Sequence, residues 1–296
     1  IPYQITSTFP PAVNSETAVN SNNTDRKIRK ERSGHGCCRA LYCEMVKIIL
    51  SGCCGHMGQT ITGIVAEDPD IEIAAGIDVR DNGTCGYPVF PEFAQCTVQA
   101  DVIVDFSSPA VFDAMMDYSV ANQVPVVVCT TGLSQEQIAR LEEDSKKVAV
   151  LRSANMSLGI NLLMKLLKEA AQTLAPAGFD IEIVEKHHNL KKDAPSGTAL
   201  ALADSINEAM NHQYTYKFDR SQDYQPRQKN ELGISAMRGG NIVGVHEVLF
   251  AGMDETIEFT HTAYSKGVFA KGAVQAAKYL AGKPAGFYHM SDVIDG

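Results

Sequence analysis

The sequence predicts an α/β protein with a Rossmann-type, doubly wound parallel sheet and a second α+β domain whose open sheet is mainly antiparallel. Three observations carry this prediction. A glycine-rich turn follows an apolar run at residues 46–50. Apolar runs then alternate with helical patterns up to residue 157, as in parallel sheets. Segments of alternating polar and apolar residues dominate after residue 230, which favours an antiparallel sheet with one open face.

The length of 296 residues suffices for two domains. We expect a dinucleotide-binding domain at residues 46–157, completed by the C-terminal segment 267–296, and a substrate-binding and oligomerisation domain at 158–266. Residues 1–44 are rich in Ser, Thr and Asn and show no apolar period, so we expect a disordered leader or tag that precedes a start at Met45. A transit peptide is the alternative, although four acidic residues in this segment argue against it.

Composition excludes several classes of protein. A formal net charge of −9 argues against a nucleic-acid partner, and no apolar run is long enough for a membrane span. The eight cysteines form no C-x-x-C pair, so we expect reduced thiols, no metal site and a cytoplasmic location.

The turn Gly52–Gly58 reads G-x-x-G-x-x-G and connects an apolar run to a helical pattern beginning at Gln59. A second apolar run, 71–77, ends at Asp78, twenty positions beyond Gly58. Glycines allow a tight turn and close approach to a pyrophosphate, the helix start offers N–H groups, and the carboxylate would bind ribose hydroxyls. This arrangement predicts a dinucleotide site, against the alternative of a merely structural turn.

Further strands are predicted at 101–106, 124–129 and 148–151, with helices at 110–122 and from a capping box at Ser134. Ligands of such sheets bind at the carboxyl ends of the strands. The residues there, which are also typical of ordinary turns, include Thr130, Thr131, Ala154 and Asn155.

In the second half, we expect a connecting helix at 158–175, a strand at 180–185, a helix at 198–210 capped by Ser196, a surface loop at 208–231, three strands at 234–238, 243–250 and 255–262, and a closing helix at 266–281 that could return to the first domain.

The segment Glu185–Ala199, E-K-H-H-N-L-K-K-D-A-P-S-G-T-A, concentrates groups that carry chemistry. His187 and His188 can change charge near neutral pH, Lys191 and Lys192 are cations, and the turn into the next helix exposes N–H groups to an anion. These groups predict a site that holds an acidic small molecule and moves a proton. The alternative is a solvated loop.

This segment resembles the signature of the 4-hydroxy-tetrahydrodipicolinate (dihydrodipicolinate) reductase family. The likeness extends from Val46 to Gly296 and includes D-F-S-x-P at 105–109, T-T-G at 130–132 and R-G-G-N-I-V-G-V-H at 238–246. It implies an enzyme that uses NADH or NADPH to reduce a cyclic dicarboxylate in the diaminopimelate route to lysine, and a homotetramer formed through the second domain.

The resemblance also implies roles for single residues. His187 and Lys191 match the proton-transferring residues, and the substrate carboxylates would be held by His188, Gly197 and Thr198, with Ser196 close by. The cofactor would be contacted in three places. The glycine turn contributes Gly52, Cys53, Cys54, Gly55, His56 and Met57, and Asp78 is the ribose position. The two loops beside the nicotinamide contribute Cys129, Thr130 and Thr131, and Ala154, Asn155, Met156 and Ser157.

Two positions depart from the family pattern. Cys129 stands where many members have glycine, and Val79 where a basic residue often meets the 2′-phosphate of NADPH, although Arg80 follows it. A carboxylate at Asp78 without an adjacent cation would repel this phosphate, so we expect NADH to be preferred and NADPH to remain usable.

Two other functions fit parts of the sequence. A different NAD(P)-dependent dehydrogenase could share the first domain, and an acylating semialdehyde dehydrogenase would need Cys129 as nucleophile. A nucleotide-binding module without catalysis would leave His187 and Lys191 unexplained.

Overall fold

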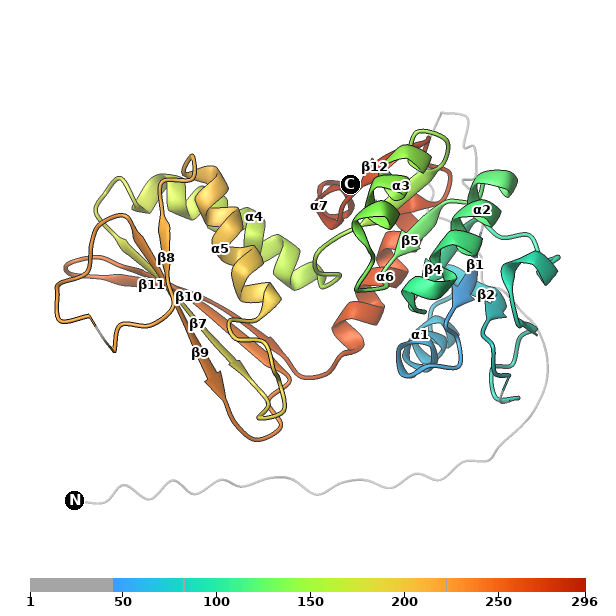
Figure 1. Ribbon diagram of the computed structural model, residues 1–296, viewed down its shortest axis with the longest axis horizontal. Coiled ribbons are helices and arrows are strands. Elements are labelled where there is room, and N and C mark those ends of the chain that lie inside the picture. Colours follow the sequence, from blue (N-terminus) through green and yellow to red (C-terminus); the bar gives the residue numbers. More distant parts are fainter. Residues whose placement is uncertain (1–44, 82, 222) are drawn as a thin grey trace, which may run out of the picture. The chain divides into compact units, whose positions relative to one another are not determined.

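The computed structural model describes residues 45–81, 83–221 and 223–296, so the expectation for residues 1–44 lies outside the described residues. The described chain contains two sheets with helices packed on them (Figure 1). None of its helices within these ranges combines the length and the apolar character needed to cross a lipid bilayer.

Within the described part of the chain, the first sheet has seven parallel strands in the order β12-β6-β5-β4-β1-β2-β3, so the chain winds outward in both directions from β1. This confirms the predicted doubly wound sheet. The strands are β1 (Val46–Ser51), β2 (Ile71–Ile77), β3 (Val89–Phe90), β4 (Val102–Asp105), β5 (Val126–Val128), β6 (Ala149–Arg152) and β12 (Gly286–Tyr288). The edge strands β3 and β12 were not predicted, because runs of two and three residues carry no readable period.

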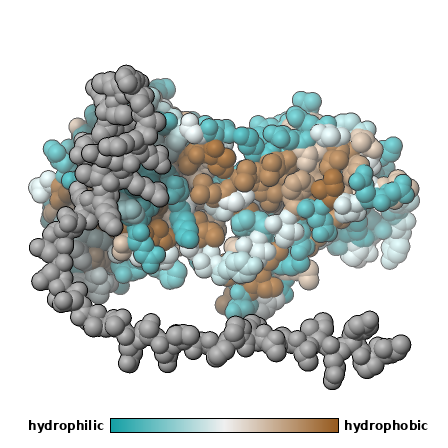
Figure 2. All heavy atoms as spheres, turned by 180° about the vertical axis from the view of Figure 1, so that it is seen from behind, coloured by the Kyte–Doolittle hydropathy of each residue, from teal (hydrophilic) through white to brown (hydrophobic). Residues whose placement is uncertain are grey.

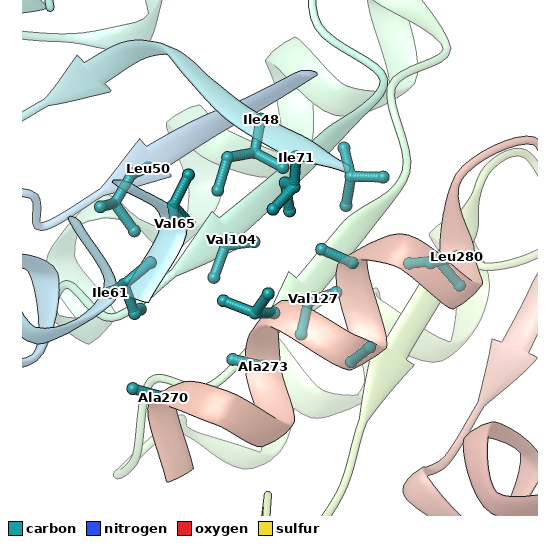
Figure 3. Packing of buried hydrophobic residues seen from close by; sticks show 14 of the residues in the cluster. Ile48, Leu50, Ile61, Val65, Ile71, Val104, Val127, Ala270, Ala273 and Leu280 are labelled. Carbon is teal, nitrogen blue, oxygen red and sulfur yellow. The ribbon is translucent and has the colours of Figure 1, made fainter. Parts of the chain in front are cut away.

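Both faces of this sheet are buried, which explains why its strands read as continuous apolar runs. Ile48 and Leu50 of β1 pack in one cluster, while Ile49 between them packs in the other. Figure 3 shows the first cluster, where Ile61 and Val65 and the small residues of a C-terminal helix meet the sheet.

Among the residues that the structure describes, five helices accompany this sheet. Helices α1 (His56–Ala66) and α6 (Gly267–Leu280) contribute to the first cluster, and α2 (Phe112–Asn122) and α3 (Gln135–Asp144) to the second; α7 (Met290–Asp295) ends the chain. The closing helix does return to the first sheet, since Ala270 and Ala273 of α6 lie in the first cluster. The capping box predicted at Ser134 is confirmed. Short 3₁₀ turns occupy Phe93–Gln95 and Pro109–Val111.

The second sheet has five strands in the order β11-β10-β7-β9-β8. They are β7 (Asp180–His187), β8 (Thr215–Lys217), β9 (Glu231–Arg238), β10 (Gly244–Ala251) and β11 (Thr256–Ala263). Helices α4 (Leu158–Leu174) and α5 (Gly197–Ala209) pack on one face, and their apolar side chains share a core with Ile181, Ile183, Val248 and Phe250.

This sheet differs from the prediction in two respects. Strand β10 runs antiparallel to β7 and β11, as expected, but β7 lies between β10 and β9 and runs parallel to β9. The sheet is therefore mixed, because helix α5 connects β7 to the next strands as in a β-α-β unit. The short strand β8, which is parallel to β9, lies within the segment expected to be a loop.

Candidate functional site

The glycine turn between β1 and α1 has the backbone geometry that only glycine allows. Gly52 has φ of 78°, and a Cβ atom there would lie 2.6 Å from the carbonyl oxygen of Phe106. A Cβ atom at Gly58 would collide with the carbonyl oxygen of Gly52. The start of α1 is thus packed against the end of β1, which places the first N–H groups of the helix at the carboxyl edge of the sheet.

Asp78 follows β2 beside this turn. Its Oδ2 atom accepts a hydrogen bond from the backbone N–H of Cys54 at 3.0 Å, and its Oδ1 atom accepts one from the N–H of Arg80 at 3.2 Å. A cavity of about 440 Å³ is lined by Cys54, Gly55, Asp78, Val79 and Arg80. The turn and the predicted ribose-binding carboxylate therefore share one cavity.

A larger cavity of about 790 Å³ brings together most of the other predicted residues. From the first sheet and its helices come Met57, Cys129, Thr130, Thr131, Ala154, Asn155 and Met156, and from the second half of the chain come His187, His188, Lys191, Ser196, Gly197 and Thr198. Asn155 Nδ2 donates a hydrogen bond of 3.0 Å to Oγ1 of Thr198, which links the two sets.

Four predicted residues line neither cavity. Cys53 is fully buried in the core, and Ser157 accepts a hydrogen bond from the N–H of Ile160 as the N-cap of α4. Gly52 and His56 lie at the start of the turn and at the start of α1.

The side chain of Glu185 is fully buried and organises the groups at the carboxyl end of β7. Its carboxylate accepts two hydrogen bonds from Arg238, at 2.7 and 2.8 Å, and one from the N–H of Ser196 at 2.9 Å. Burial alone would raise the pKa of Glu185, but the hydrogen bonds from Arg238, His187 and Ser196 outweigh it and lower this pKa. The carboxylate is therefore ionised at neutral pH.

His187 Nδ1 lies 2.6 Å from Oε2 of Glu185. Because an ionised carboxylate can only accept, Nδ1 must carry a proton and donate it. The nitrogen that remains available to a ligand is consequently Nε2. This is the arrangement in which a carboxylate sets the tautomer of a histidine and leaves the other nitrogen for chemistry.

A second histidine, His246, packs edge-on against His187 with the ring centroids 5.2 Å apart. Its Nε2 atom lies 3.1 Å from Oγ of Ser196, which also caps α5 by accepting from the N–H of Ala199. Burial, together with the nearby charge of His187, lowers the pKa of His246 to about 4. His246 is thus neutral at physiological pH, and its Nε2 atom shares a hydrogen bond with the Ser196 hydroxyl.

Lys191 forms an ion pair with Asp193, with 2.9 Å between Nζ and Oδ1, and this pair lowers the pKa of Asp193. Lys191 lines the large cavity, whereas the adjacent Lys192 is exposed and does not. The cavity also contains the first residues of α5, so an ammonium group and a helix N-terminus meet there, as an anionic ligand requires.

Sequence reasoning did not assign Glu185, Arg238 and His246 to the site. All three lie within the motifs quoted above, but they become neighbours only through strand pairing, since Glu185 is opposite His246 and His187 is opposite Arg238. The available signal was the alternation along β7, which places Glu185 and His187 on the same face as the apolar Ile183. A buried carboxylate and histidine on an apolar face indicate a site.

The thiol of Cys129 is a poor nucleophile. Burial and the negative charge of Asp105 raise its pKa well above the ordinary value, so the thiolate is disfavoured. This argues against an acylating semialdehyde dehydrogenase.

Comparison with known proteins gives a consistent result over both halves. The family models described as dihydrodipicolinate reductase, N-terminus and C-terminus, match residues 46–156 and 159–294. The 4-hydroxy-tetrahydrodipicolinate reductase of Clostridium novyi is 49% identical over 250 residues, which cover 84% of this chain and 98% of the relative. That of Caldanaerobacter subterraneus subsp. tengcongensis is 46% identical over 250 residues with the same coverage.

Among solved structures, the dipicolinate-bound dihydrodipicolinate reductase from Paenisporosarcina sp. TG-14 matches with a TM-score of 0.70. It is 24% identical and covers 83% of this chain and 97% of that chain. At this identity, the likeness concerns the fold.

Proposed function

Since the chain belongs to the dihydrodipicolinate reductase family, we propose that it reduces 4-hydroxy-tetrahydrodipicolinate with NADH or NADPH, in the diaminopimelate route of lysine biosynthesis, in the 790 Å³ cavity. The observation that carries this proposal is the convergence there of the nicotinamide loops, at the carboxyl edge of the first sheet, with His187, Lys191 and the start of α5.

The residues of the first half fit a dinucleotide. The glycine turn offers the phosphates the N–H groups of α1, and Asp78 offers its carboxylate to ribose hydroxyls. Thr130 Oγ1 is buried and has no hydrogen-bond partner among the described residues. Because buried polar atoms are normally hydrogen-bonded, this hydroxyl is suited to bond to a ligand in the cavity. When bound, the reduced nicotinamide supplies the hydride.

The second half holds the dicarboxylate. Lys191 and the N–H groups of Gly197 and Thr198 neutralise one carboxylate through charge-assisted hydrogen bonds, and His188 contacts the substrate from the same wall of the cavity. Ser196 supports this wall, because its hydroxyl both caps α5 and bonds to His246.

His187 delivers the proton. Once the 4-hydroxyl group has left as water, the conjugated ring accepts hydride at one carbon and needs a proton at the next. In its doubly protonated form His187 donates this proton from Nε2, and Glu185 stabilises the imidazolium through Nδ1–H. Lys191, the second candidate proton donor, lies on the same cavity and can assist this transfer while its charge holds the substrate.

We also propose that NADH is preferred. The described cavity around Asp78 contains Val79 and Arg80, and Asp78 accepts from the backbone N–H of Arg80. A carboxylate at the ribose hydroxyls favours NADH, because it repels the 2′-phosphate of NADPH.

A homotetramer is proposed through the face of the second sheet that α4 and α5 leave uncovered. Val245 and Leu249 of β10 lie on this face and are only partly buried, and Met237 of β9 is 55% exposed. On the side of the molecule drawn in Figure 2, apolar residues gather in patches at the surface. Light scattering coupled to size exclusion measures the mass directly.

The proposed activity is tested by following oxidation of NADH and NADPH when the substrate is generated in place by the synthase that precedes this step. We expect substrate-dependent oxidation and competitive inhibition by 2,6-pyridinedicarboxylate, a planar dicarboxylate. Cofactor binding without turnover would contradict the proposal and favour a nucleotide-binding module.

A further inference from the structure

Three thiols gather beside the cofactor turn. Cys53 and Cys54 belong to the turn itself, and Cys85 comes from the segment after β2, although the cysteine spacing predicts no metal site. The Sγ atoms of Cys53 and Cys54 are 3.9 Å apart, and those of Cys54 and Cys85 are 3.8 Å apart. All three sulfur atoms lie within 4.8 Å of one another, so one ion could contact all of them.

These separations match those around a thiolate-bound zinc ion. With Zn–S bonds of about 2.3 Å and tetrahedral angles, neighbouring sulfur atoms lie about 3.8 Å apart. We propose that Cys53, Cys54 and Cys85 form a binding site for a thiophilic divalent cation such as Zn²⁺, with water in the fourth position.

The surroundings hold the three side chains in place. Cys53 and Cys85 are buried and Cys54 is half-buried. Gly76 of β2 makes room for Cys53, because a Cβ atom there would lie 2.5 Å from its Sγ atom. Gln59 of α1 donates a hydrogen bond from Nε2 to Sγ of Cys85 at 3.7 Å. The cluster is therefore built into the fold by α1, β2 and the turn, which reduces the entropy lost when an ion binds.

Binding would change the charge beside the dinucleotide. A cysteine binds a metal ion as the thiolate, so the cluster releases protons when the ion binds. Three thiolates and one Zn²⁺ then carry a net charge of −1. Since the N–H of Cys54 bonds to Asp78, this charge lies next to the ribose and phosphate positions. The ion should therefore weaken dinucleotide binding, a consequence that rests on the proposed function.

The site is tested with Co²⁺ as a spectroscopic probe on the full-length reduced protein, in a background in which Cys37, Cys38 and Cys43 are replaced by serine. We expect one equivalent of Co²⁺ to produce thiolate-to-cobalt charge-transfer absorption, and Zn²⁺ to remove it by displacement. Cys85→Ser should abolish this absorption, whereas the matched control Cys96→Ser, a buried cysteine of the other cluster, should retain it. No absorption, or absorption that persists in Cys85→Ser, would overturn the site.

A second measurement examines the consequence. We expect stoichiometric Zn²⁺ to raise the Kd for NADH about threefold to tenfold, as one added negative charge nearby would, and Cys85→Ser to remove this effect. An unchanged Kd beside a clear cobalt spectrum would overturn the antagonism but keep the metal site. Failure to bind NADH without Zn²⁺ would count against the proposed function, and the cobalt spectrum would be unaffected by it.

Discussion

Nδ1 of His187 lies 2.6 Å from Oε2 of Glu185. The side chain of Glu185 is fully buried, and its carboxylate also accepts hydrogen bonds from both terminal nitrogens of Arg238. This contact orients the imidazole so that its second nitrogen, Nε2, is left for the proton transfer that we propose. The carboxylate is a positioning residue in the proposed reaction, because it acts through the histidine.

Replacing this carboxylate should affect catalysis far more than binding. We expect Glu185→Gln to lower kcat on the order of 10²-fold, because an amide can present either a donor or an acceptor to Nδ1 and no longer stabilises the imidazolium. The KM for the dicarboxylate and the Kd for NADH should change less than about threefold.

Glu182→Gln is the matched control for this variant. Glu182 lies on the same strand and pairs with Arg220 and Arg227, but it does not line the cavity. Its kcat should be unchanged. Equal losses of activity in both variants would indicate a general effect on the sheet and would count against the positioning role.

Lys191 lines the cavity and the adjacent Lys192 does not, so the two lysines can distinguish the effect of a cation inside the cavity from that of a cation close to it. We expect Lys191→Ala to lower kcat and raise KM, together costing on the order of 10²-fold in kcat/KM, because a buried charge-assisted hydrogen bond contributes about 1.5–3 kcal/mol. Lys192→Ala should behave like the unmodified enzyme in steady-state kinetics. Near-normal kinetics of Lys191→Ala would refute its role.

Cofactor preference depends on Asp78 in this account. The unmodified enzyme should show a higher kcat/KM with NADH than with NADPH, and Asp78→Asn should reduce the difference at least severalfold by removing repulsion of the 2′-phosphate. Asp81 is an exposed acid nearby, and Asp81→Asn should leave the difference between NADH and NADPH unchanged. An equal or higher kcat/KM with NADPH in the unmodified enzyme would overturn the proposed preference.

The two glycines of α1 should respond in opposite ways to the same substitution. Gly58→Ala forces a Cβ atom against the carbonyl oxygen of Gly52, so we expect a loss of NADH binding and of stability. Gly63 faces open space, and Gly63→Ala should raise stability by up to about 1 kcal/mol through helix propensity. Calorimetry and NADH titration compare the two. NADH binding by Gly58→Ala as tight as by Gly63→Ala would show that the turn tolerates a side chain.

The depressed pKa of His246 makes stability depend on pH. Because the folded protein holds this imidazole neutral, the unfolded chain takes up the proton first as pH falls below 6.5, and stability is lost down to the folded pKa of about 4. Between pH 7 and pH 4, this single group should lower the free energy of unfolding by about 3 kcal/mol.

The loss is measured by urea unfolding at each pH. His246→Gln, which keeps a polar group near Ser196, should lose about 3 kcal/mol less over this range than the unmodified protein. The control His212→Gln changes an exposed histidine and should leave the pH dependence unaltered. Parallel pH profiles of the His246 variant and the unmodified protein would exclude His246 as the cause.

Much of this molecule could be predicted from local sequence. The Ser196 cap of α5 and the capping box at Ser134 depend on residues three positions apart, and β2 has the predicted bounds. The pairing of β7 with β9 and β10 could not be predicted, since strand order depends on contacts between residues more than 40 positions apart. The same pairing brings Glu185 to His246 and His187 to Arg238, which is why the supporting residues of the site were missed. The contact between Cys85 and Cys54 of the turn could not be predicted either, because it also joins residues that are far apart in the sequence.

The central claim is that His187 supplies the proton in a cavity that also receives the nicotinamide, and it is tested most directly by measuring kcat and NADH affinity together in His187→Ala. We expect kcat to fall on the order of 10²-fold or more, while the Kd for NADH stays within about twofold of the unmodified enzyme. A variant that reduces the substrate at a near-normal rate would contradict the account.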